Sequence, residues 1–64
     1  MKVNGTIILL EQSQTLLAFL EAQGFDINTI AVEHNGKITP RATYKDVLLR
    51  DEDTLEIVQF VGGG

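Results

Sequence analysis

The sequence predicts one small α+β domain, in which a single helix packs across one face of a mixed β-sheet. Two Asn-Gly pairs, Asn4-Gly5 and Asn35-Gly36, predict two β-hairpins. An amphipathic segment between them has apolar side chains at helical spacing, and the last apolar segment alternates as a strand does. Because the helix has one apolar stripe to bury, we expect it to cover one face of the sheet.

Length and composition limit the class of protein. The 64 residues correspond to one domain with a compact core. The chain is 44% hydrophobic and 22% charged, which is ordinary for a folded protein. With no cysteine, its own side chains offer no disulfide, thiolate ligand or persulfide. The apolar run near the start is too short for a signal peptide or a membrane span, so we expect a cytoplasmic protein without membrane contact.

The charge distribution argues against nucleic acid as a partner. The chain has five basic and nine acidic residues, a net charge of −4, and no basic stripe with interleaved aromatic residues. Four acidic residues cluster near the end, at Asp51, Glu52, Asp53 and Glu56. Together with Arg41 they either steer a basic protein partner or form an ordinary solvated face, and both interpretations stay open.

The helix is predicted between the two hairpins. Ser13 is the expected N-cap, because its hydroxyl can accept from a backbone N–H two or three residues later. Leu16, Phe19 and Leu20 fall on one face, which is far more commonly core than a binding face. Gly24 stands where a glycine of positive φ would end the helix after about two and a half turns.

The strands are predicted from alternation and turn residues. Residues 29–35 form a strand that Asn35-Gly36 turns into residues 37–39, and Pro40 ends this hairpin. The final strand begins at Thr54 and is expected to bury Leu55 and Ile57. Hairpin, helix, hairpin and last strand give the order ββαββ. If the last strand lies parallel to the first, the arrangement is a β-grasp.

The last three residues are glycines, Gly62, Gly63 and Gly64. We expect a domain over residues 1–61 and a flexible tail over residues 62–64, because glycine has the greatest conformational freedom. Stretched, these residues reach roughly 10 Å. Backbone without side chains can thread a narrow channel and present the Gly64 carboxylate to an active site on another protein. The alternative is a frayed terminus without function.

Several of these features together resemble the ThiS family of sulfur carrier proteins of thiamin biosynthesis. The resemblance covers essentially the whole chain. It rests on the length, the order of elements, Asn35-Gly36, Pro40-Arg41, Tyr44, the acidic turn Asp51 to Asp53, and the ending Val61 to Gly64. The sequence departs from the family pattern at Glu52, where a glycine is usual, and at His34, where an apolar residue is usual.

The resemblance implies a ubiquitin-like protein that carries sulfur and is not itself an enzyme. Gly64 would be adenylated by an E1-like adenylyltransferase, converted to a thiocarboxylate with sulfur from a sulfur-donating enzyme, and would donate that sulfur to thiazole synthase. Gly62 and Gly63 would thread the partner's active site, and Val61 would lead into them. No cofactor would bind to the chain, because ATP is used by the activating partner.

We expect a partner to dock at Val58, Phe60 and Val61, beside the tail, since exposed aromatic and aliphatic anchors supply most interface energy. The alternative is that they cover the rim of the core. His34 lacks a second ligand at suitable spacing, so we expect no metal site. A carrier for a molybdopterin-type pathway, a ubiquitin-like protein modifier and an interaction module with an inert tail remain alternative functions.

Overall fold

A computed structural model describes residues 1–60, and residues 61–64 lie outside the described part. The chain forms β1 (Lys2–Val3), β2 (Thr6–Ile7), α1 (Leu16–Ala22), β3 (Ile30–His34), β4 (Lys37–Ile38) and β5 (Thr54–Gln59). Two 3₁₀ helices, Ile27–Thr29 and Arg41–Asp46, precede β3 and follow β4. The predicted hairpins, helix and last strand are therefore confirmed. Because each hairpin contributes two strands, the sheet has five.

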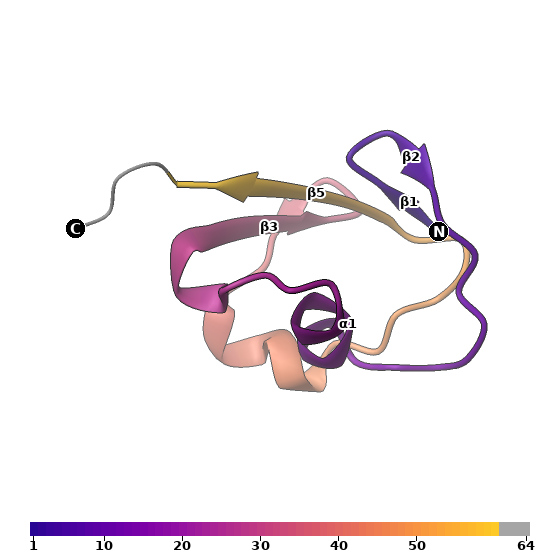
Figure 1. Cartoon of the computed structure of the whole chain (residues 1–64), viewed down its shortest axis with the longest axis horizontal. Coiled ribbons are helices and arrows are strands. Elements are labelled where there is room, and N and C mark those ends of the chain that lie inside the picture. Colours follow the sequence, from indigo (N-terminus) through magenta and orange to yellow (C-terminus); the bar gives the residue numbers. More distant parts are fainter. Residues whose placement is uncertain (61–64) are drawn as a thin grey trace.

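The strands form one mixed sheet in the order β2-β1-β5-β3-β4. The last strand of the chain, β5, lies at its centre, parallel to β1 and antiparallel to β3 (Figure 1). This is the β-grasp arrangement that the sequence predicts. Both edges are formed by strands of two residues, which present few backbone groups to a neighbouring chain.

Both hairpins turn at the predicted Asn-Gly pairs. Asn4 and Gly5 have φ angles of 49° and 83°, and Asn35 and Gly36 have 52° and 84°. Positive φ at both central residues is the signature of a type I′ turn, which matches the twist of the flanking strands. The first hairpin is short, because the strand after Gly5 ends at Ile7.

The core lies between the sheet and the elements that pack on one of its faces. Helix α1 and the 3₁₀ helix Arg41–Asp46 are on the same side of the sheet (Figure 1). The buried apolar side chains are Met1, Val3, Leu16, Phe19, Leu20, Ile30, Val32, Tyr44, Leu49, Leu55 and Ile57. The predicted apolar stripe of the helix and the predicted inner face of the last strand are both part of this set.

The start of the helix differs from the prediction. The N-cap is Thr15, whose Oγ1 accepts from the N–H of Ala18 at 3.1 Å, and Ser13 lies two residues outside. Thr15 is also held by pairing with Leu48, and the N–H of Leu16 donates to the carbonyl of Val47 at 2.8 Å. These long-range contacts fix where the helix begins, and residue type alone does not reveal them.

The end of the helix agrees with the prediction. Gly24 has a φ of 85°. Its N–H donates to the carbonyl of Glu21 at 3.1 Å, and the N–H of Phe25 donates to the carbonyl of Leu20 at 3.0 Å. This pair of bonds is a Schellman motif, which satisfies carbonyls that the helix itself leaves without partners. Phe25 is partly buried against the core.

We predict that Thr15→Ala destabilises the domain by about 1 kcal/mol, since it removes the side-chain acceptor of the first turn. Ser13→Ala is the matched control and should change the free energy of unfolding by less than about 0.5 kcal/mol. Urea unfolding followed by circular dichroism measures both. A larger loss for Ser13→Ala than for Thr15→Ala would contradict the assignment of the cap.

Candidate functional site

The central strand β5 leads the chain out of the domain. Thr54 lies beside Lys2, next to the N-terminus, and Gln59 lies opposite Ile30 at the far end of the sheet. The carboxyl end of β5 therefore points away from the N-terminus (Figure 1). The N–H of Phe60 donates to the carbonyl of Thr29 at 2.7 Å. The backbone is thus held to the sheet up to the residue that precedes Val61.

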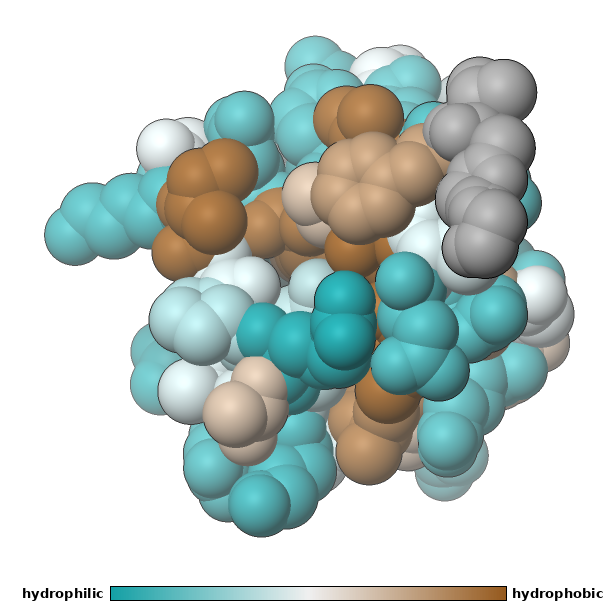
Figure 2. Space-filling view, turned by 90° about the vertical axis from the view of Figure 1, so that its left-hand side faces the viewer, coloured by the Kyte–Doolittle hydropathy of each residue, from teal (hydrophilic) through white to brown (hydrophobic). Residues whose placement is uncertain are grey.

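The predicted docking residues are exposed where they are described. Leu55 and Ile57 are buried, whereas Val58 is 58% and Phe60 is 53% exposed. Figure 2, which looks onto the end of the molecule where β5 finishes, shows hydrophobic side chains at the surface among hydrophilic ones. The predicted sides of the strand are therefore confirmed. Val61, Gly62, Gly63 and Gly64 lie outside the described residues, so their predicted roles remain predictions.

Where β1 ends, the side chain of Asn4 makes the hydrogen bonds to β5 that the backbone of a longer strand would make. Its Oδ1 accepts from the N–H of Ile57 at 2.7 Å, and its Nδ2 donates to the carbonyl of Ile57 at 3.2 Å. These bonds satisfy the backbone of β5 beyond the last residue of β1. The sequence identifies Asn4 only as a turn residue, because this contact spans 53 positions of the chain.

The predicted acidic cluster is not a single surface. Asp53 is only 6% exposed, so including it among steering charges is wrong. One of its oxygens accepts from Nδ2 of Asn35 at 3.1 Å. The other accepts from the N–H of Arg50 at 2.9 Å and lies 2.9 Å from Nε2 of His34. Asp53 thus joins the second hairpin to the turn before β5.

This environment sets the protonation of Asp53. Burial alone would raise the pKa of the carboxyl group, but hydrogen bonds to His34, Asn35 and the N–H of Arg50 outweigh it. The pKa of Asp53 is therefore below its ordinary value of 3.8. His34 is partly exposed at the end of β3, and its contact with Asp53 gives it a structural role.

Asp51 also has a structural contact. Its Oδ1 accepts from the N-terminal ammonium group of Met1 at 3.0 Å and from the N–H of Leu10 at 3.2 Å. These bonds hold the pKa of Asp51 below its ordinary value. Among the four acidic residues of the predicted cluster, Glu52 and Glu56 are the exposed ones without a hydrogen bond in the described part of the chain.

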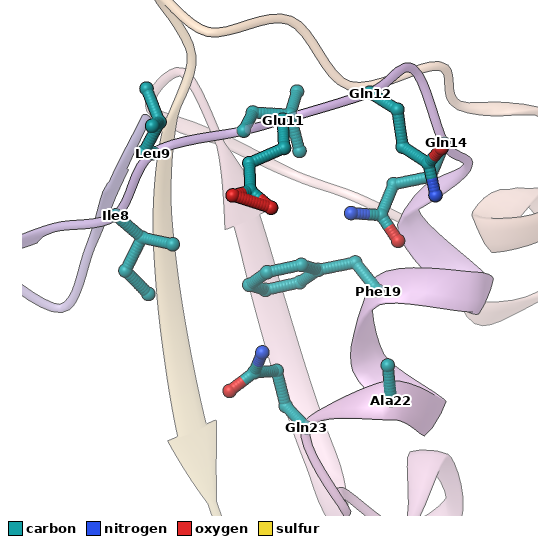
Figure 3. A pocket seen from close by; sticks show the side chains of 9 residues that line it. Ile8, Leu9, Glu11, Gln12, Gln14, Phe19, Ala22 and Gln23 are labelled. Atoms are coloured by element: carbon teal, nitrogen blue, oxygen red, sulfur yellow. The ribbon is translucent and has the colours of Figure 1, made fainter.

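A hollow of about 340 Å³ opens between α1 and the segment that precedes it. The ring of Phe19 lies at its centre, with Glu11, Gln14 and Gln23 around it (Figure 3). No lysine, arginine or histidine lines it. A cavity with a carboxylate and no cation is a poor place for a phosphate-bearing ligand. Residues 1–60 also contain no group of three side chains able to hold a metal ion, and no helix that could cross a membrane.

A small β-grasp domain whose central last strand leads into a glycine tail defines the class of ubiquitin-like carrier and modifier proteins. The ThiS family model matches residues 1–64, the whole sequence. The chain therefore belongs to the ThiS family.

Similar proteins agree with this assignment. "Sulfur carrier protein ThiS" of Bacillus subtilis is 40% identical over 63 residues, covering 98% of this chain and 82% of that protein. "Thiazole synthase" of Paramagnetospirillum magneticum is 42% identical over 62 residues, and "Thiazole synthase" of Magnetococcus marinus is 39% identical. This chain spans only 19% of each thiazole synthase. The crystal structure of the thiamine biosynthesis protein ThiS from Geobacter metallireducens has a TM-score of 0.82 at 27% identity, covering 98% and 96% of the two chains.

We predict that Asp53→Ala lowers the free energy of unfolding by about 2 kcal/mol, because it leaves the Arg50 N–H and the Asn35 amide without their charged acceptor. Glu52→Ala is the control, because Glu52 is the neighbouring residue and is exposed. It should change the free energy of unfolding by less than about 0.5 kcal/mol. Urea unfolding measures both. Equal effects of the two substitutions would contradict the structural role of Asp53.

The same carboxylate gives a pH dependence of stability. Because the folded pKa of Asp53 is below the unfolded one, the unfolded chain binds this proton more readily. The stabilisation is complete above the ordinary value of 3.8 and is lost as the pH falls from there through the folded pKa. We expect the unfolding midpoint of the native chain to drop over this range more steeply than that of Asp53→Ala. If the unfolding midpoints of the two proteins fall in parallel as the pH decreases, the result contradicts this expectation.

Proposed function

We propose that this chain is a sulfur carrier protein in thiamin biosynthesis and acts in the cytoplasm. The observation that carries the proposal is the family match over residues 1–64, together with 40% identity to a sulfur carrier protein over 98% of this chain. The proposed carrier group is the carboxylate of Gly64, which follows two further glycines, Gly62 and Gly63.

The chemistry proceeds at Gly64 and uses a partner's active site. A carboxylate is a poor electrophile, so an E1-like adenylyltransferase joins it to AMP from ATP and releases pyrophosphate. Sulfur supplied by a sulfur-donating enzyme then attacks the acyl carbon, AMP leaves, and a thiocarboxylate results. The carrier contributes no catalytic side chain and binds no cofactor. Its contribution is recognition and delivery.

Thiazole synthase is the proposed acceptor of the sulfur. In the two similar proteins named thiazole synthase, a segment resembling this whole chain is part of the same polypeptide. Such a covalent link keeps two proteins at high effective concentration, which is useful where one acts on the other. It supports a functional association between this carrier and a thiazole synthase.

Docking is proposed to use the exposed end of β5. Val58 lies in β5 and Phe60 directly follows this strand, and both residues are apolar and exposed. Phe60 is also held by its backbone to Thr29, so a partner would meet an anchor that is already ordered. Gly62 and Gly63 would then thread the partner's channel, and Val61 would complete the docking surface beside them.

The first prediction of this proposal is a change in mass. After incubation with ATP, the activating enzyme of the same organism and a sulfur source, intact-protein mass spectrometry should show one oxygen of Gly64 replaced by sulfur. A chain lacking Gly64 is the control and should stay unchanged. If the activating enzyme modifies another carrier but not this chain, the proposed function is wrong, and lysine conjugates become the alternative to test.

The second prediction concerns docking. Phe60→Ala should raise the Kd for the activating enzyme about tenfold or more, because a central aromatic anchor contributes roughly 2 kcal/mol. Leu9→Ala is the matched control, since Leu9 is 74% exposed and lies in the segment between β2 and α1. It should leave the Kd within about twofold. Isothermal titration calorimetry measures both, and equal Kd values for the two variants would contradict the docking role of Phe60.

A further inference from the structure

Each of the two hairpin turns begins with an asparagine whose side chain is bonded to β5 or to the residue before it. The Oδ1 of Asn4 accepts from the N–H of Ile57 at 2.7 Å, and its Nδ2 donates to the carbonyl of Ile57 at 3.2 Å. The Oδ1 of Asn35 accepts from the N–H of Thr54 at 2.9 Å, and its Nδ2 donates to Oδ1 of Asp53 at 3.1 Å. Both ends of each amide group are therefore occupied.

The main chain of the same two residues is also held to β5. The N–H of Asn4 donates to the carbonyl of Leu55 at 2.9 Å, and the N–H of Asn35 donates to the carbonyl of Thr54 at 2.8 Å. Each asparagine thus makes three hydrogen bonds to the last strand or the residue before it. These bonds direct the amide carbon Cγ of each asparagine toward β5.

The glycine after each asparagine makes this arrangement chemically important. Asparagine amides are labile, and they are lost most readily before glycine, which has no side chain to hinder the reaction. The backbone nitrogen of the glycine attacks Cγ, its proton goes to the leaving amide nitrogen, ammonia departs and a five-membered succinimide ring forms. Water then opens the ring at either carbonyl and gives aspartate or isoaspartate.

The folded hairpins oppose this reaction. The attacking glycine nitrogen belongs to the turn, whereas the hydrogen bonds hold Cγ toward β5. The attack therefore requires the asparagine side chain to leave β5 and swing back over its own turn. A hairpin that opens away from β5 frees the side chain, and such local opening populates only a small fraction of a folded protein.

We propose that Asn4 and Asn35 are deamidation sites that the folded domain protects by binding their amide groups to β5 and to Asp53. Modification then takes place in chains whose hairpins have separated from β5, and it marks those chains. This is a covalent modification of the domain itself, and it does not depend on the proposed function.

The products do not restore the contacts that are lost. Deamidation of Asn35 places a second carboxylate where an amide now donates to Asp53, which is only 6% exposed, so two like charges meet with little water around them. Deamidation of Asn4 places a carboxylate oxygen against the carbonyl of Ile57, and neither atom carries a hydrogen. Isoaspartate also adds Cβ to the main chain, which lengthens a two-residue turn. Refolding therefore does not reverse the damage.

The first test compares deamidation of the native chain in buffer and in urea above its unfolding transition, at the same neutral pH. Peptide mapping by mass spectrometry detects the exchange of NH2 for OH at each site. We expect Asn4 and Asn35 to react at least about tenfold more slowly in buffer, because the folded hairpins open rarely. Asn28, which precedes Thr29, is the internal control and should keep its amide in both solutions. Equal rates in buffer and urea at Asn4 and Asn35 would overturn the proposal.

The second test separates the amide contacts from general stability. Asp53→Ala removes the acceptor of the Asn35 amide and no side-chain contact of Asn4, so the rate at Asn35 in buffer should rise at least about threefold more than the rate at Asn4. Thr15→Ala is the matched control, because it destabilises the helix without touching either amide, and it should raise both rates by the same factor. An unchanged ratio of the two rates in Asp53→Ala would refute the protective role of this bond.

The third test concerns the product. Asn35→Asp reproduces the aspartate form, and we expect it to lower the thermal unfolding midpoint because its carboxylate faces that of Asp53. Asn28→Asp adds the same charge at an exposed position whose side chain makes no hydrogen bond within residues 1–60, and it should change the midpoint much less. Equal midpoints for the two variants would show that deamidation leaves the contact intact, against the proposal.

Discussion

The central position of β5 is the constraint on which the rest of the structure depends. β5 pairs with β1 on one side and with β3 on the other. It therefore connects the first strand of the chain with the second hairpin. The alternation of side chains then buries Leu55 and Ile57 under the helix and exposes Glu56 and Val58. A shift of one residue would exchange the two sets, so the register that builds the core also determines which side chains of β5 are exposed.

The size of the domain explains why that surface remains open. A chain of this length buries only about 60% of the surface that it exposes when unfolded, and a helix of seven residues covers only one face of the sheet. Exposed apolar side chains such as Ile38 and Phe60 follow from this geometry. Phe60 becomes informative because it directly follows the carboxyl end of β5.

Local signals predicted most of the fold. The Asn-Gly turns, Gly24 and the alternation of the last strand each specify a backbone conformation by residue type, and the structure agrees with all of them. The errors concern residues whose role depends on distant partners. Ser13 and Thr15 are both plausible caps, and only pairing with Leu48 selects Thr15. In the sequence, Asp53 belongs to a charged turn. It is buried only because the second hairpin places His34 beside it.

A carrier must release each partner after a transfer, and a small docking surface would suit that requirement. A contact limited to a few exposed apolar side chains, such as those of Val58 and Phe60, would bury little area and would be released readily. Under the proposed function, specificity would reside in the surface of the domain, because three glycines have no side chains that could distinguish one channel from another.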